Sequence, residues 1–207
     1  MRDTIIETAQ RLFLQQGLRT TTMDQIAESL GISKKTLYEY FDSKDTLIAA
    51  CADSFLTRME RELETLRSQH SENVLLSMTA TASYAYQVLA SINPILFKEL
   101  RRLLPPARAQ VIPRIQKLIT HHLSRSLEEG IRQGIFRPDL PVDLLPLWVS
   151  YAILHIVLNS DFAQQVNRPV AEIYAETLLL LLHSFCSEKG RNLLETYRHS
   201  IRKAYAK

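Results

Sequence analysis

The sequence predicts an all-α fold, and three observations support that prediction. Apolar residues recur every three or four positions through most of the 207 residues. No stretch of any length alternates apolar and polar residues as a half-buried strand does, and the chain has only five glycines. Its 46% hydrophobic and 23% charged residues are typical of a globular protein with a sizeable core. We therefore expect helices joined by short turns.

The first fifty residues contain the clearest helix boundaries. A helix is expected over residues 3–16, because Gly17 provides a stop directly after it. A second helix should begin at Thr22, since threonine followed three residues later by Gln25 forms a capping box for the first backbone amides. That helix should end at Gly31, where glycine adopts a left-handed conformation without steric cost.

A third helix is expected directly after this turn. Ser33 is placed to cap it, while Leu37 and Phe41 lie four residues apart and form its inner face. Four side chains are then left to project outward, and these are Lys34, Lys35, Tyr38 and Tyr40. Two short helices with a tight turn between them are the layout of a helix-turn-helix, whose second helix enters the major groove of DNA.

The position of the basic residues, rather than their number, supports DNA binding. Residues 1–50 carry six basic and seven acidic side chains, a net charge of −1, although the whole chain has a net charge of +3. Lys34 and Lys35 stand at a helix N-terminus, where positive charge opposes the helix dipole. That arrangement is favourable if phosphates neutralise both ammonium groups. The alternative is an ordinary pair of packed helices around a glycine.

Several motifs in this region stand at a spacing typical of one protein family: Ala27, Gly31-Ile32-Ser33, Thr36-Leu37-Tyr38, Tyr40-Phe41 and Lys44. Residues 5–50 resemble the N-terminal domain of the TetR family of bacterial transcriptional regulators. The resemblance implies a three-helix DNA-binding domain over residues 1–46 and a helical effector-binding and dimerisation domain over residues 47–207. It further implies phosphate contacts by Thr22, Ser33, Lys34, Thr36, Tyr40 and Lys44, and base contacts by Lys35 and Tyr38.

The rest of the chain also has helical periodicity. Ser43 should cap a long helix that ends near His70. Further helices are expected over residues 72–91, 95–104, 107–134, 142–159, 170–186 and 188–207. The segments 142–159 and 170–186 are apolar on nearly every side, so a partner must cover them. We expect a homodimer in which both chains contribute these two helices to a four-helix bundle, as the resemblance also implies.

Five aromatic or histidine side chains are candidates for binding a small-molecule effector: Tyr84, Phe97, Trp148, Tyr151 and His155. Tyrosine hydroxyls within an apolar helix wall are suited to a pocket for an organic ligand. The alternative is ordinary helix packing for Tyr84, and a core or subunit interface for the set at 148, 151 and 155, which follows helical spacing.

Other classes of function lack support in the sequence. No nucleophile with its base, glycine-rich phosphate loop or metal-ligand spacing occurs, so we expect no enzyme, cofactor or metal site. The adjacent His121 and His122 point in different directions on a helix and have no suitable partners. Cys51 and Cys186 are expected as reduced, buried thiols. Neither a signal peptide nor a membrane-spanning stretch is expected, which predicts a cytoplasmic protein.

These observations lead to two hypotheses of function. In the first, a homodimeric regulator, expected to be a repressor, binds an inverted-repeat operator and is released by a small molecule. In the second, the chain binds DNA, but its C-terminal domain holds a protein partner instead of a small molecule. The sequence does not identify the effector, the operator or the regulated genes.

Overall fold

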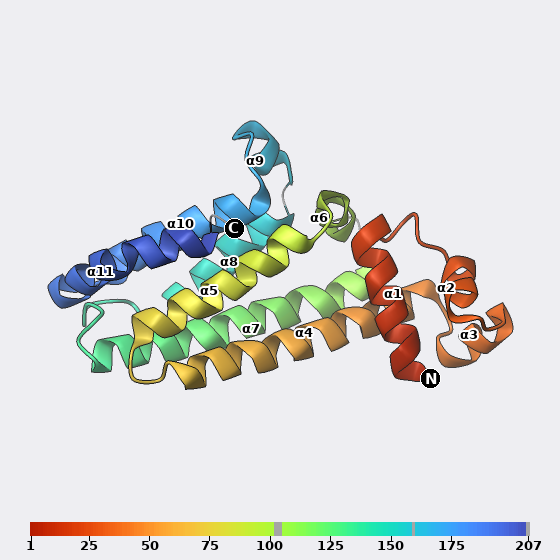
Figure 1. Ribbon diagram of the computed structural model, residues 1–207, viewed down its shortest axis with the longest axis horizontal. Coiled ribbons are helices and arrows are strands. Elements are labelled where there is room, and N and C mark those ends of the chain that lie inside the picture. The colour runs from red at the N-terminus through yellow and green to blue at the C-terminus, as the bar shows by residue number, and fades with distance from the viewer. Residues whose placement is uncertain (102–104, 159, 206–207) are drawn as a thin grey trace. The chain divides into compact units, whose positions relative to one another are not determined.

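The computed structural model describes residues 1–101, 105–158 and 160–205, with only the backbone described at some helical positions, and its ribbon is shown in Figure 1. In this part of the chain, the regular structure is helical, which confirms the predicted all-α class. The helices are α1 (Arg2–Gln16), α2 (Met23–Leu30), α3 (Lys34–Tyr40), α4 (Lys44–Gln69), α5 (Val74–Ser91), α6 (Pro94–Arg101), α7 (Pro105–Arg132), α8 (Leu145–Leu158), α9 (Ser160–Gln165), α10 (Val170–Phe185) and α11 (Glu188–Tyr205).

The backbone packs into two compact units. The first unit consists of Met1–Met59 and Ile92–Ile115, and the second of Glu60–Ser91 and Gln116–Lys207. The first unit therefore includes α6 and the beginning of α7 in addition to the three N-terminal helices. The division of function after residue 46 remains a prediction, because packing does not assign function.

Apolar side chains from α1, α2, α3 and the first half of α4 form the core of the first unit. Ile5, Ile26, Leu37 and Leu47 have no exposed surface. Figure 1 shows α1, α2 and α3 gathered around the beginning of α4. The buried amide of Gln10 ties α1 to α4, because its Nε2 donates a 2.7 Å hydrogen bond to the carbonyl oxygen of the α4 residue at position 51.

Helix α6 is joined to the turn between α1 and α2 by one carboxylate. Oε1 of Glu99 accepts a 3.2 Å hydrogen bond from the backbone amide of Arg19, and Oε2 accepts another from the amide of Leu18. The turn begins at Gly17, whose φ of 93° is positive, as the predicted stop requires. A side chain at Gly17 would also meet Oε2 of Glu99 at 2.8 Å. The positive φ therefore favours glycine here, and a larger residue would also displace the Glu99 carboxylate.

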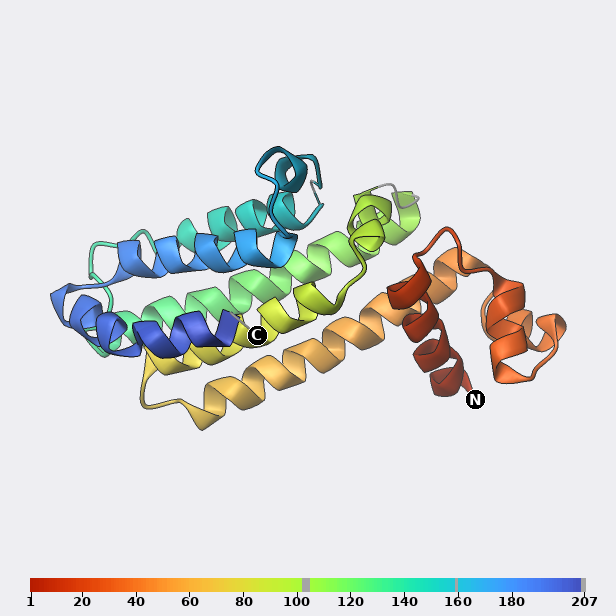
Figure 2. The same cartoon turned by 45° about the horizontal axis from the view of Figure 1, so that its top comes forward.

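In the second unit, α10 packs against both α5 and α8, and α11 packs against α5. Figure 2 shows α8 and α10 running beside one another. The segment after α7 closes against the end of α10. There, the amide of Arg137 donates to the carbonyl of Phe185 at 2.9 Å, and the amide of Ser187 donates to that of Ile135 at 2.9 Å. These hydrogen bonds fix the entrance to α11.

Between residues 1 and 205, leaving out 102–104 and 159, no helix is both long and apolar enough to cross a membrane.

Candidate nucleic-acid interface

Both helices of the predicted helix-turn-helix begin with the expected caps. Oγ1 of Thr22 accepts the amide of Gln25 at 3.2 Å, and the Gln25 side chain accepts the amide of Thr22 at 2.8 Å, which confirms the capping box of α2. Oγ of Ser33 accepts the amide of Thr36 at 3.0 Å, so α3 is capped as well. These local bonds fix where each helix starts.

The turn between α2 and α3 depends on glycine. Gly31 has φ 66° and ψ 27°, a left-handed conformation, and its amide is bonded to carbonyls at the end of α2. An added Cβ would meet no atom within 4 Å, so the requirement comes from backbone conformation and not from crowding. Leu37 of α3 is fully buried against α2, which sets the side of α3 that faces outward.

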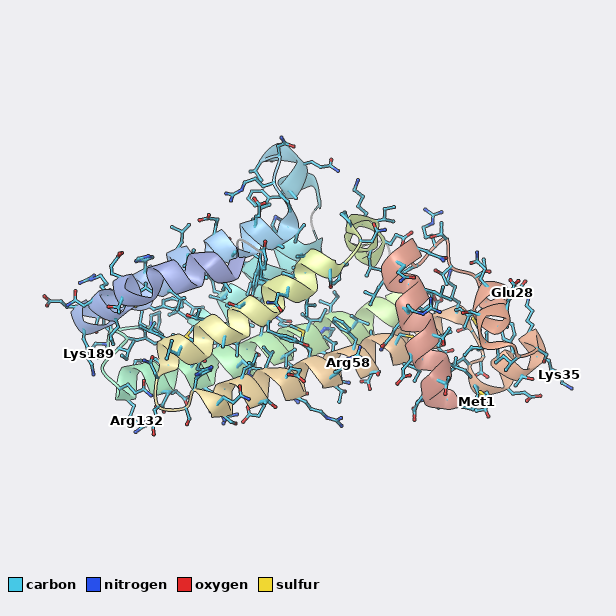
Figure 3. All side chains as sticks on the ribbon, viewed as in Figure 1. Met1, Glu28, Lys35, Arg58, Arg132 and Lys189 are labelled. Atoms are coloured by element: carbon cyan, nitrogen blue, oxygen red, sulfur yellow. The ribbon has the colours of Figure 1, made fainter. Side chains whose placement is uncertain are left out.

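The outer face of α3 carries the predicted DNA-contacting side chains. Tyr38 and Tyr40 expose 40% and 42% of their surface, which is high for aromatic residues, and Lys35 is exposed. Figure 3 shows Lys35 at the outer edge of the first unit. Thr36 is half-buried, with its hydroxyl 2.8 Å from that of Ser33. The face therefore combines positive charge, hydroxyl groups and flat aromatic rings.

Lys34 is exposed but already paired with an acidic residue. Its Nζ lies 2.7 Å from Oδ1 of Asp24, at the start of α2. This hydrogen bond and the charge of the Asp24 carboxylate raise the pKa of Lys34, so the ammonium form is favoured. Sequence reasoning did not assign a role to Asp24. The two residues stand ten positions apart on separate helices, and only the angle of the turn brings them together.

Lys44 lies at the first position of α4 and is half-buried, unlike the lysines of α3. Burial lowers its pKa, while the neighbouring carboxylates of Glu99 and Asp45 favour the charged form. Ser43 caps α4 as predicted, because its Oγ accepts the amide of Thr46 at 3.2 Å. The backbone thus places Lys44 at the start of a capped helix, close to the carboxylate that anchors α6.

The candidate effector-binding residues that the structure describes have different settings. Trp148 and Tyr151 expose 54% and 60% of their surface, and His155 is exposed on the same helix, α8. Tyr84 is half-buried on α5. The side chain of Phe97 lies outside the described residues. Within the single chain, the three α8 residues share an outward face, which favours the interface alternative for them.

A capped pair of short helices, a left-handed glycine turn and an exposed basic and aromatic face define the chain as a helix-turn-helix DNA-binding protein. Comparison with known proteins identifies the family. Residues 5–51 match the family described as bacterial regulatory proteins, tetR family. The transcriptional repressor KstR2 of Mycobacterium tuberculosis H37Rv is 30% identical over 157 residues, which cover 72% of this chain and 78% of that protein. The chain belongs to the TetR family.

Further relatives and solved structures agree with this assignment. KstR2 of Rhodococcus jostii RHA1 is 29% identical over 145 residues, covering 69% of this chain and 71% of the other. The fold is similar to that of a TetR-family regulator from Pectobacterium atrosepticum, with a TM-score of 0.66, 20% identity and coverage of 90% and 94%. A gamma-butyrolactone receptor has a TM-score of 0.65 at 20% identity, with coverage of 98% and 96%. The chain is a DNA-binding transcriptional regulator, and its family is not a family of enzymes.

Proposed function

We propose that the chain acts as a homodimer that binds an inverted-repeat operator through α3 and represses transcription until a small molecule releases it. The observation that carries the proposal is the outer face of α3, where Lys35, Tyr38 and Tyr40 are exposed on a helix fixed by Leu37. The phosphates and base edges of a DNA groove can form ionic contacts and hydrogen bonds with the lysine and tyrosine side chains of this face.

The proposed contacts divide by position on the two helices and on α4. Residues at or near helix starts present hydroxyl or ammonium groups to the DNA backbone, and Tyr40 adds its phenol; this set is Thr22, Ser33, Lys34, Thr36, Tyr40 and Lys44. Lys35 and Tyr38 reach base edges. Lys34 must then exchange its bond with Asp24 for a phosphate, so its contribution to affinity is the difference between two ionic contacts.

An exposed apolar face on α8 and α10 supports the homodimer. Leu147, Trp148 and Tyr151 expose 46%, 54% and 60% of their surface at three- and four-residue spacing on α8. Leu180, on the neighbouring α10, exposes 71%. A row of large apolar residues on two packed helices is the pattern that a second copy covers in a four-helix bundle. A two-fold axis there would present two copies of α3 to the two half-sites of an operator.

A small organic effector is supported by the family relatives. A solved structure of KstR2 from Mycobacterium tuberculosis is described as a ketosteroid transcriptional regulator, and another similar structure as a gamma-butyrolactone receptor. We infer an effector of the same general kind, an apolar molecule with few polar groups, held by residues 47–207. Release follows if the effector prefers a dimer arrangement in which the two α3 helices do not fit the operator.

The first test is to find the operator. Purified protein is incubated with fragmented DNA from its own genome at physiological salt, and the retained DNA is sequenced. We expect enrichment of one short inverted repeat. Retention without a shared repeat would contradict the operator proposal and favour nonspecific DNA binding with a protein partner. A thermal-shift screen of apolar compounds then addresses the effector, since a ligand bound to the native state raises the melting temperature.

Single substitutions test the contacts. Lys35→Ala and Tyr38→Ala should each weaken operator binding about tenfold or more, since a base contact contributes about 1–3 kcal/mol of discrimination. Both substitutions should also reduce the preference for particular bases, while Tyr40→Ala should weaken binding to all DNA sequences equally. The control is Lys117→Ala, which removes an exposed lysine from α7. Equal affinities for the three variants and the control would refute the assignment.

The dimer face is tested separately by Leu180→Glu. A carboxylate at this exposed apolar position should be harmless in the monomer and unfavourable in a buried interface. We expect light scattering to give a monomer mass, with operator affinity lost in parallel. The control is Asn192→Glu, at an exposed position on α11. A Leu180→Glu protein that remains dimeric would remove this face from the proposal.

A further inference from the structure

A polar cavity lies within the second unit, where the end of α4, the beginning of α5 and the last turns of α7 meet. Its volume is about 170 Å³, and the residues that give it its chemistry are Arg67, His70, Ser77, Arg125, Ser126 and Arg132. A single water needs roughly 10–15 Å³ of such space, so the cavity is large enough for a group of several heavy atoms. Figure 3 marks this end of α7 with Arg132.

Two arginines at the cavity share one carboxylate. Nε and Nη2 of Arg67 donate to Glu64 at 3.0 and 2.5 Å, and Nη1 of Arg125 donates to the same carboxylate at 3.1 Å. The guanidinium groups hold the pKa of Glu64 down, at about 2, with the Arg67 hydrogen bond as the main cause. The single negative charge of Glu64 is thus shared by the two positive charges of Arg67 and Arg125. Each guanidinium has five N–H donors, so both retain donors for a further acceptor.

The third arginine is held in place by its own partner. Nε and Nη2 of Arg132 donate to Glu129 at 3.1 and 2.6 Å. With Glu64 and Glu129 as the carboxylates and three arginines, this group has a net charge of +1. Glu64 therefore orients Arg67 and Arg125 in the absence of a ligand, while one positive charge of the group stays uncompensated. Pre-oriented guanidinium groups are well suited to planar or tetrahedral oxyanions.

A serine hydroxyl adds a neutral donor to the cavity. Ser77 lines the cavity with only 5% of its surface exposed. A serine hydroxyl can donate one hydrogen bond to an acceptor such as an oxyanion. The first amides of α5 are not available, since the Asn73 and Gln133 side chains accept those of residues 74 to 76. The donors left for a ligand are side chains.

We propose that this cavity binds a small oxyanion, a phosphate or carboxylate group, with Arg67 and Arg125 supplying charge and Ser77 donating its hydroxyl proton. Arg132 closes the side of the cavity formed by the last turn of α7. The anion can be free or can be one end of a larger molecule. The proposal does not depend on operator binding, because none of these residues belongs to the unit that contains α1, α2 and α3.

The test is calorimetric titration of the full chain with sodium phosphate and, separately, with sodium malonate, both at constant ionic strength against sodium chloride. We expect one saturable site per chain for at least one oxyanion and none for chloride. The better of the two ligands identifies phosphate or carboxylate as the group recognised. Absence of saturable binding for both oxyanions would overturn the proposal.

Three variants locate the site. Arg125→Gln and Ser77→Ala should each raise the dissociation constant about tenfold. The matched control is Arg168→Gln, because Arg168 also pairs with two carboxylates, those of Glu172 and Glu176. Arg168 lies between α9 and α10 and does not line the cavity. Ser77→Ala keeps all charges, so it still tests the site if Arg125→Gln fails to fold. Undiminished binding in Ser77→Ala would overturn the proposal.

The helix-turn-helix is the competing location for an anion, since its lysines are expected to bind phosphate. The double variant Lys34→Ala with Lys35→Ala settles this point. We expect its phosphate or malonate affinity to match that of the unsubstituted protein within about twofold. Loss of anion binding in this variant, with binding retained in Ser77→Ala, would place the anion on the DNA-binding surface instead.

Discussion

Replacing Glu99 with alanine should loosen the turn between α1 and α2, and the structure allows the cost to be worked out. The carboxylate accepts the backbone amides of Leu18 and Arg19. Leu18 is buried, so its amide would lose its partner without free access to water, at a cost of about 1–3 kcal/mol. Arg19 is exposed, and water can replace most of the second bond. The total is therefore about 2 kcal/mol.

Thermal denaturation followed by circular dichroism measures this effect. For a chain of this size, about 2 kcal/mol corresponds to a decrease of roughly 4–8 °C in melting temperature. Glu99→Gln keeps one acceptor oxygen and should lose about half as much. The control is Glu128→Ala, at an exposed position on α7, which should leave the melting temperature nearly unchanged. If Glu99→Ala and Glu128→Ala have the same melting temperature, the Glu99 carboxylate does not stabilise the turn.

Three further predictions concern other parts of the molecule. Gly130→Ala should destabilise the protein by about 1–3 kcal/mol in urea denaturation, because the new Cβ would lie 2.0 Å from the buried Phe136 ring; an unchanged midpoint would mean that the ring can move. Burial lowers the pKa of His122, so the unfolded chain binds a proton more readily and stability falls as pH drops below about 6.5. His122→Phe should remove this part of the acid sensitivity, measured as the difference in unfolding free energy between pH 7.5 and 5. Asp24→Asn frees Lys34 from its ion pair and should tighten DNA binding and steepen its salt dependence; weaker binding would show that the pair orients Lys34 for DNA.

The sequence predicted best what depends on neighbouring residues. The capping box of Thr22 and Gln25, the Ser33 cap and the left-handed Gly31 all involve atoms within five positions of one another, so local chemistry determines them. Exposure of Tyr38 followed in the same way, because four-residue spacing assigns each side of a short helix once Leu37 is buried.

Contacts between distant segments were not predictable in this way. Glu99 reaches amides about 80 positions earlier in the chain, and nothing in its neighbourhood distinguishes it from a surface acid. Arg58 of α4, labelled in Figure 3, is a second example, because its Nη2 donates a 3.2 Å hydrogen bond to Oε1 of Gln10 in α1, 48 positions earlier. The polar cavity likewise takes residues from three helices, and only packing of those helices brings their charges together.

The reactivity of the two buried cysteines can be used to measure local opening of the chain. Each unit contains one: Cys51, with its pKa raised by burial to about 12, in the first, and Cys186, with no exposed surface, in the second. The thiolate is the nucleophile that attacks an alkylating reagent, so each buried cysteine reacts only when its surroundings open. Pulse alkylation followed by mass spectrometry of the two peptides therefore times the opening of each unit separately, in the natural sequence and without an introduced label. Adding operator DNA should mainly slow the alkylation of Cys51, and adding an effector should mainly slow the alkylation of Cys186.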